Sequence, residues 1–192
     1  MRRLVLASTS PQRRAILEQL RIPFEVVAPA YVEHDPPDAD PEELVRAHAL
    51  GKARSVHRDG DVTLGVDTTV HLDGRVFGKP ADRGDAESML RTLSGRVHTV
   101  VSGLCLLARD VEVVETARTA VSFRPLGDED VATYLESGEW EGRAGGYAIQ
   151  GLGGRLVEGI DGDYLNVVGL PGALLVTLLG LHGTELLQSG GS

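Results

Sequence analysis

Short apolar runs alternate along this chain with segments whose apolar residues recur at helical spacing. Residues 4–7 form the first apolar run and predict a strand, and residues 11–20 predict the helix that follows it. The same alternation predicts further strands at residues 24–28, 63–66, 69–72, 76–77, 97–107 and 111–123, and further helices at residues 41–57, 82–93, 128–135 and 171–181. Strands that alternate with helices are typical of an α/β protein.

Turn residues between these elements indicate one folded unit. Asp73 and Gly74 form a hairpin signal, and glycines are frequent between residues 142 and 154, where we expect a loop region. The chain contains neither an internal repeat nor a recognisable interdomain linker. We therefore expect one mixed α/β domain over residues 1–187, followed by a tail at residues 188–192 that is disordered.

Composition and charge narrow the class of protein. The 192 residues are 42% hydrophobic and 24% charged, which is ordinary for a soluble globular protein with a real core. The net charge of −9 argues against nucleic-acid binding, because affinity for a duplex needs clustered cations. Cys105 is the only cysteine, and no apolar stretch has the length of a signal peptide or a membrane span. We expect a cytoplasmic protein without a membrane partner.

Hydroxyl and guanidinium groups gather after the first strand. Ser8 and Ser10 follow the strand, and Arg13 comes at the start of the next helix. The N-terminus of a helix carries partial positive charge and arginine adds paired donors, so this turn predicts an anion site. The alternative interpretation is an ordinary helix cap followed by solvated arginines.

A carboxylate and a hydroxyl, Asp67 and Thr68, directly follow the apolar residues 64–66. A carboxylate at the C-terminal end of a buried strand lies where α/β folds place their ligands. Such an aspartate can activate a water molecule or hold a divalent metal. The alternative interpretation is an aspartate that caps a helix or stabilises a turn.

Four more polar side chains are candidates for ligand binding. Lys52 has small neighbours on its helix face that let it reach inward, and Lys79 stands between a glycine and a proline. Gln150 lies in an apolar segment flanked by glycines, which we read as a strand, and its amide needs partners that a nucleobase edge would supply. Solvated lysines and a backbone contact of the glutamine are the alternatives. Glu33 lies in an acidic, proline-rich loop whose alternative interpretation is disorder.

Taken together and in order, these motifs resemble the Maf family of nucleoside triphosphate pyrophosphatases, which is related in fold to inosine triphosphate pyrophosphatase. The resemblance extends over nearly the whole chain. The matching segments are residues 6–14, Glu33, and residues 49–53, 65–70, 78–80, 93–100, 138–140, 144–151 and 166–171. The resemblance implies a mixed α/β fold of two lobes, with a long twisted central sheet and a cleft between the lobes.

The resemblance also implies an activity and a cofactor. The expected reaction is hydrolysis between the α- and β-phosphates of a nucleoside triphosphate, which gives a monophosphate and pyrophosphate with the help of Mg²⁺ or Mn²⁺. Asp67 matches the catalytic carboxylate that accepts a proton from the attacking water, and Glu33 matches an acid that holds the metal together with Asp67. Which of the two is the principal metal ligand stays open. The matched substrate-binding residues are Ser8, Ser10, Arg13, Lys52, Lys79 and Gln150.

Three positions bear on the choice of base, namely Gln12, Thr68 and Gln150. Thr68, together with His98, resembles the branch of the family that prefers dTTP and UTP; a branch that prefers 7-methyl-GTP tends to have glutamine in place of Thr68. Gln12 departs from the pyrimidine branch, which usually has arginine there. An amide can bond to a base or a ribose but lacks the fixed charge of arginine. We expect dTTP, UTP or a modified nucleotide as substrate.

The sequence also leaves open a function other than catalysis. It is a nucleotide-binding regulator of cell division or septum formation that binds without significant turnover. The charged residues Glu33, Lys52, Asp67 and Lys79 argue against it, because each costs desolvation if it has no ligand to meet. A homodimer is an assembly that the sequence leaves open.

Overall fold

The computed structural model describes residues 3–36 and 39–182, so the expected tail at residues 188–192 lies outside the described residues. A seven-stranded mixed sheet has the order β2-β1-β3-β5-β6-β7, and β4 pairs with β3. The strands are β1 (Arg3–Ala7), β2 (Glu25–Val26), β3 (Asp61–Leu72), β4 (Arg75–Phe77), β5 (Val97–Ala108), β6 (Val111–Phe123) and β7 (Val157–Asp161). The helices are α1 (Pro11–Gln19), α2 (Pro41–Val56), α3 (Arg83–Leu93), α4 (Asp128–Glu136), η1 (Ala144–Gly146), η2 (Leu152–Leu156), α5 (Tyr164–Val168) and α6 (Gly172–His182).

The long strand β3 changes its partner along one edge. β1 runs parallel to β3 and ends where Ala7 pairs with Gly65. β4 joins the same edge only at Val70, in an antiparallel direction. On its other edge β3 pairs with β5 from Thr63 to His71. Within the described residues, the edge of β3 between Gly65 and Val70 is therefore left without a neighbouring strand, which makes room for a site beside the sheet.

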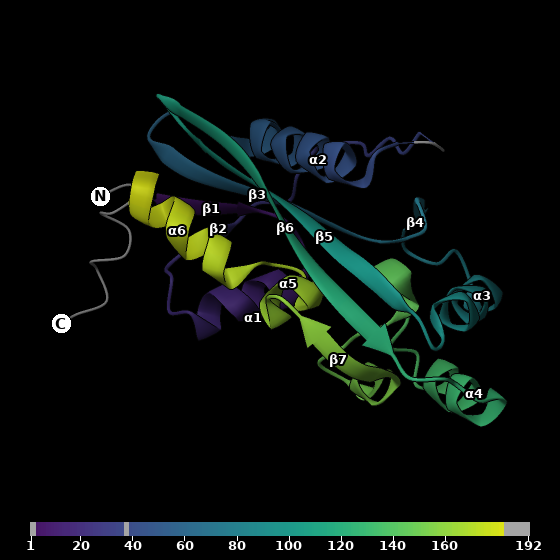
Figure 1. Cartoon of the computed structure of the whole chain (residues 1–192). Helices are drawn as coiled ribbons and strands as arrows, with labels where there is room; N and C mark the ends of the chain where they lie inside the picture. The colour runs from purple at the N-terminus through teal and green to yellow at the C-terminus, as the bar shows by residue number, and fades with distance from the viewer. Residues whose placement is uncertain (1–2, 37–38, 183–192) are drawn as a thin grey trace.

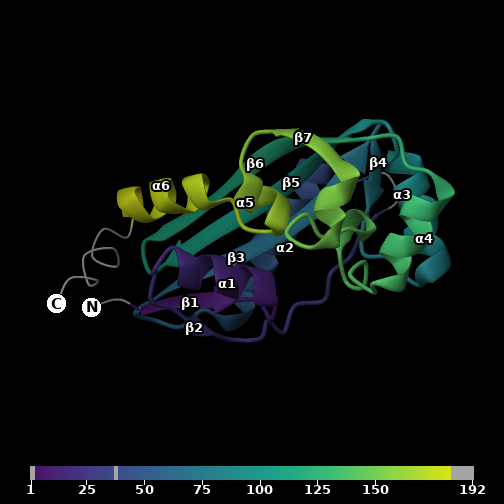
Figure 2. The ribbon, with the colours of Figure 1, turned by 90° about the horizontal axis from the view of Figure 1, so that it is seen from below.

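Helices cover both faces of this sheet (Figures 1 and 2). Helix α2 lies on one face, and α1, α5 and α6 lie on the other. Two glycines let α2 approach closely, because a Cβ atom at Gly65 would lie 2.0 Å from the Ala49 carbonyl oxygen and one at Gly103 would lie 2.3 Å from that of Val45. Side chains at these two positions would push the helix away from the sheet.

Two hydrophobic cores divide the molecule into two lobes on one continuous sheet. The first lobe has its core among β1, α1, α6 and the adjoining ends of β3 and β5, with Leu6, Leu64 and Leu104 fully buried. The second lobe has its core among α3, α4, β4 and the opposite ends of the same strands, with Phe77 and Leu90 at its centre. Figure 1 shows α3 and α4 at the far end of the sheet from α6. The expected α/β fold of two lobes is confirmed.

Three local expectations need correction. Residues 63–66 and 69–72 are not separate strands, because both belong to β3, which its ladder with β5 keeps extended through the polar pair between them. Asp67 and Thr68 therefore lie inside a strand, although just beyond the last residue that β1 covers. Gln150 lies in a turn and not in a strand, because the glycines before it adopt positive φ angles that bend the chain.

Helix α6 is the apolar closing helix that the sequence predicts. It begins at Gly172, and Leu175, Leu178 and Leu179 are buried in the core of the first lobe. The buried leucines of α6 therefore pack within the first lobe. Over residues 3–36 and 39–182, none of the helices combines the length and the apolar character that crossing a membrane requires.

Candidate active site

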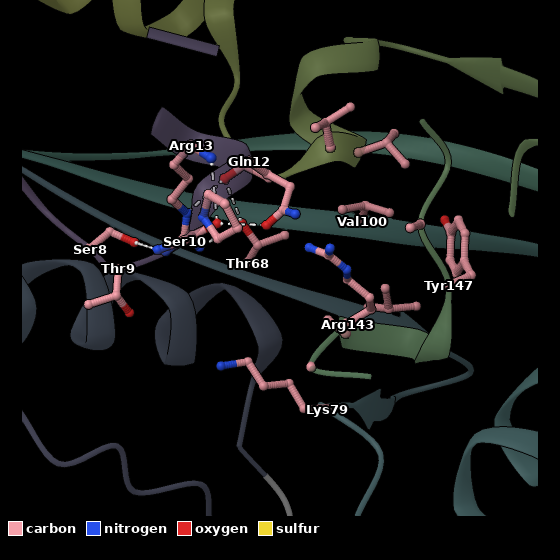
Figure 3. Close-up of a pocket in the computed structure, with 18 of the residues that line it drawn as sticks. Ser8, Thr9, Ser10, Gln12, Arg13, Thr68, Lys79, Val100, Arg143 and Tyr147 are labelled. Atoms are coloured by element: carbon pink, nitrogen blue, oxygen red, sulfur yellow. Dashed lines mark hydrogen bonds between the residues drawn. The ribbon is translucent and has the colours of Figure 1, made fainter. Parts of the chain in front are cut away.

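A cavity of about 450 Å³ opens beside the uncovered edge of β3 (Figure 3). Its walls come from the turn between β1 and α1, from residues 141–150 and from residues 167–169. The cavity brings together nearly all the residues that the sequence singles out, which are Ser8, Ser10, Gln12, Arg13, Glu33, Lys52, Thr68, Lys79 and Gln150. Asp67, at 9% exposure, does not line it and lies behind Lys52 and Glu33.

The turn between β1 and α1 is shaped by its own hydroxyl groups. Ser10 caps α1, because its side chain accepts a hydrogen bond from the backbone N–H of Arg13 at 3.5 Å, and Pro11 fills the first helical position. Ser8 Oγ accepts from the backbone N–H of Ser10 at 3.2 Å. Gln12 Oε1 accepts from Ser10 Oγ at 3.1 Å. The cap interpretation therefore holds for the backbone, and the same turn still faces the cavity.

Arg13 joins three segments that surround the cavity. Its Nε donates to the Gly169 carbonyl at 3.0 Å, Nη1 donates to Ser8 Oγ at 3.1 Å, and Nη2 donates to Thr68 Oγ1 at 3.3 Å. Burial lowers the pKa of the Arg13 guanidinium, and the charges of Asp67 and Glu33 act in the opposite direction. A cation so firmly held presents a fixed charge to the cavity instead of a flexible one.

Thr68 has its hydroxyl group engaged within the protein. Thr68 Oγ1 lies 2.8 Å from Ser102 Oγ and donates to the Gly169 carbonyl at 3.3 Å, in addition to its contact with Arg13. The hydroxyl group therefore stabilises the wall of the cavity that Thr68 lines.

Asp67 belongs to a charged cluster on the α2 side of the sheet. Lys52 Nζ lies 2.6 Å from Asp67 Oδ1 and 2.5 Å from Glu33 Oε1, so one ammonium bridges both carboxylates. His48 Nδ1 lies 3.4 Å from Asp67 Oδ2. The second ring nitrogen of His48 lies 3.3 Å from the His34 carbonyl oxygen.

The sequence explains why these groups meet. Side chains alternate across a strand, so Asp67 lies on the same face of β3 as Gly65, which is the face that α2 covers. His48 and Lys52 are four residues apart on α2 and therefore share one side of the helix. Because Gly65 allows the helix to approach closely, both side chains reach the carboxylate.

The cluster keeps Asp67 ionised. Burial raises the pKa of the Asp67 carboxyl, but the hydrogen bond from His48 and the charge of Lys52 outweigh it, so that the pKa lies below its ordinary value. The hydrogen bond to Asp67 raises the pKa of His48, although burial acts against this. The cluster thus presents an anionic group that can accept a proton or bind a cation.

The same cluster has the donor set of a metal centre. One ligand atom each of Glu33, His48 and Asp67 lies within 4.8 Å of the other two. Carboxylate oxygens suit Mg²⁺ and Mn²⁺, and an imidazole nitrogen suits transition metals. The donor set fits a divalent ion, which would take the place between the two carboxylates that the Lys52 ammonium now occupies. His48 was missed from the sequence, where its spacing to Lys52 was the available signal.

His98 lies behind the wall of the cavity. Its Nε2 atom is 2.9 Å from the hydroxyl oxygen of Tyr147, and Tyr147 lines the cavity. The side chain is 1% exposed, and burial lowers the pKa of His98 to about 4. The neutral imidazole therefore supports the position of Tyr147 and does not reach the cavity itself. Arg143, which does line the cavity, was missed from the sequence.

Comparison with known proteins places this chain in a family. The model of the family described as Maf-like protein matches residues 3–181. A dTTP/UTP pyrophosphatase of Symbiobacterium thermophilum is 46% identical over 192 residues, covering 99% of both chains. Those of Thermococcus gammatolerans and Pyrococcus furiosus are 46% and 41% identical over 186 residues, covering 96% and 94% of this chain and 99% and 96% of their own. The chain therefore belongs to the Maf-like family, and the resemblance is confirmed.

Proposed function

We propose that this chain is a nucleoside triphosphate pyrophosphatase that cleaves the bond between the α- and β-phosphates of dTTP or UTP. The observation that carries the proposal is the placement of an ionised, buried carboxylate, Asp67, beside a cavity lined by hydroxyl groups and cations. The three relatives named above are dTTP/UTP pyrophosphatases, which supports the proposal. Phosphoryl chemistry needs these parts, namely an oriented water, a base and positive charge near the phosphates.

The residues of the site have separate roles in the proposed reaction. Ser8 and Ser10 offer donors, and Arg13 and Lys79 offer positive charge, to the oxygens of the triphosphate. Asp67 accepts a proton from the water whose oxygen attacks the α-phosphorus. The bond from this phosphorus to the bridging oxygen breaks, and pyrophosphate leaves with that oxygen. Lys52 holds one oxygen of Asp67 and His48 holds the other, so the carboxylate keeps one orientation.

A divalent cation, Mg²⁺ or Mn²⁺, belongs in this proposal. Glu33 and Asp67 would hold it, and His48 offers a nitrogen within reach of the same point. The ion would supply positive charge that neutralises the phosphate oxygens. Activity measured after chelation and after the return of each metal in turn tests its identity.

We propose that the part of the cavity with fewer charged residues recognises the base. Val100, Tyr147, Ala148 and Val167 provide apolar contact area for a ring. Gln12 and Gln150 also line the cavity, and amide groups can pair with the polar edge of a pyrimidine. We assign the choice of base to these two glutamines, with Thr68 acting through the shape of the wall.

The test is a panel of canonical and modified triphosphates, each incubated with Mg²⁺ or Mn²⁺ and scored by kcat/KM. We expect the highest values for dTTP and UTP, with a monophosphate and pyrophosphate as the only products. Release of orthophosphate, or no turnover of any triphosphate, contradicts the proposal. Tight nucleotide binding without turnover favours the regulatory alternative.

Three further points accompany this proposal. A cytoplasmic location and the lack of a nucleic-acid partner remain predictions, which fractionation of cells and a filter-binding assay with DNA and RNA test. A homodimer remains open, and analytical ultracentrifugation tests it.

A further inference from the structure

The cationic side chains that line the cavity differ in whether they already have partners within the protein. Arg13 donates through Nε, Nη1 and Nη2 to oxygens of the protein, and Lys52 is bridged between two carboxylates. Lys79 and Arg143 also line the cavity, and neither takes part in an ion pair within residues 3–36 and 39–182. Lys79 and Arg143 are therefore the cations of the cavity whose charge is available to a bound polyanion.

One side-chain donor of Arg143 has no partner in the part of the chain that the structure describes. Its Nε atom is buried, yet this atom has no hydrogen-bond partner among the described residues. An unsatisfied buried donor is costly, and a charged one more so, unless an acceptor arrives. Figure 3 shows the guanidinium extending toward the side of the cavity that carries Gln12 and Thr68. A phosphate oxygen is an acceptor that matches the fork of donors on arginine.

The backbone holds Arg143 and Lys79 on one wall. The N–H of Gly145 donates to the carbonyl oxygen of Gly78 at 3.1 Å, which joins the segment of Arg143 to the segment of Lys79. Gly145 has a φ of +71°, and a Cβ atom there would lie 2.9 Å from Val70 Cγ2, so only glycine fits this junction. Two cations on one wall of the cavity suit a chain of phosphate groups better than a neutral base.

We propose that Arg143, together with Lys79, binds the β- and γ-phosphates of the substrate, so that it recognises the part of the nucleotide that leaves as pyrophosphate. The inference rests on the proposed function for the identity of the ligand. Arg143 then distinguishes a triphosphate from its monophosphate product, because the product lacks both groups that this residue holds.

The experiment compares binding of two probes by calorimetry. The first is a UTP analogue with nitrogen bridging the α- and β-phosphorus atoms, which cannot be cleaved there, and the second is UMP. We expect Arg143→Gln to weaken binding of the analogue by about 10- to 100-fold, the loss of one or two charge-assisted hydrogen bonds, and to leave UMP within about threefold. Arg143→Lys restores part of the loss, because it keeps the charge but not the fork.

The control variant is Arg109→Gln, which removes the same charge from the exposed turn between β5 and β6 and should change neither affinity. The melting temperature of Arg143→Gln should be no lower than that of the wild type, since the variant removes a buried donor that has no partner within residues 3–36 and 39–182. An equal loss for both probes, or no loss for the analogue, overturns the inference. Wild-type protein that binds the analogue but cleaves no triphosphate contradicts the proposed function while leaving the role of Arg143 intact.

Discussion

Asp67 on β3 pairs directly with Gly103 on β5 in the antiparallel ladder. Gly103 has no side chain, so α2 can pack against the sheet with the carbonyl of Val45 in the space that a Cβ atom would fill. That helix carries His48 and Lys52, both of which contact Asp67. The closeness of the helix to the sheet therefore controls the surroundings of the carboxylate.

Replacement of Asp67 by asparagine should abolish turnover. The amide has the same size but cannot accept the proton of water, and the loss of a general base lowers kcat by about 100- to 10,000-fold. The measurement is release of pyrophosphate from UTP and dTTP under saturating conditions. The matched control is Asp110→Asn in the exposed turn between β5 and β6, which should behave as the wild type. Turnover within tenfold of the wild type would remove Asp67 from its catalytic role.

Replacement of Gly103 by alanine should lower both stability and activity. The added methyl group would lie 2.3 Å from the Val45 carbonyl oxygen, so α2 must shift, and overpacking of this kind costs about 1–3 kcal/mol. Urea unfolding measures the free energy, and kcat reports the displaced His48 and Lys52. The control is Gly180→Ala in α6, where nothing lies within 4 Å and alanine should stabilise the helix by about 1 kcal/mol. Equal stability of the two variants would contradict the packing argument.

The stability of the protein should depend on pH through His98. Its pKa is about 4 in the folded protein against 6.5 when unfolded, so the unfolded state binds more protons between these values. The free energy of unfolding therefore falls as the pH decreases from 6.5 toward 4, and this residue contributes about 3 kcal/mol to that fall. Urea titrations at several pH values measure the slope, and His98→Gln should flatten it. The same slope in both proteins would show that His98 is not the group responsible.

Replacement of Gln12 by arginine should change the order of preferred substrates. The glutamine side chain lines the cavity and accepts a hydrogen bond from Ser10, whereas arginine can only donate and adds a fixed charge. We expect KM to decrease for triphosphates in general and the ranking of bases to change. The panel of triphosphates proposed above is the measurement, with Arg14→Gln on the exposed side of α1 as a control for charge. An unchanged ranking would dismiss Gln12 as a specificity residue.

Much of the fold could be predicted because local patterns and tertiary packing agree. The cap at Ser10 and the apolar run of α6 both encode elements that the structure contains. β7 and α5 were missed, since elements of only five residues carry little periodic signal. The single strand β3 was divided into two because its middle residues are polar, and only pairing with β5 keeps them extended.

The sequence predicts which residues form the candidate site better than it predicts how they contact one another. The sequence indicates each hydroxyl, amide and charged residue separately, and all of them except Asp67 line the cavity. The bridge that Lys52 forms between Glu33 and Asp67 could not be foreseen, because it depends on how closely α2 approaches the sheet. Arg143 was overlooked for a similar reason, since its position depends on the bond between Gly145 and Gly78.

The strands β3 and β5 each extend through the hydrophobic cores of both lobes. The lobes are therefore joined by continuous strands, so a change in the angle between them must bend the sheet itself. The width of the cavity beside β3 thus depends on the twist of a sheet that both lobes share.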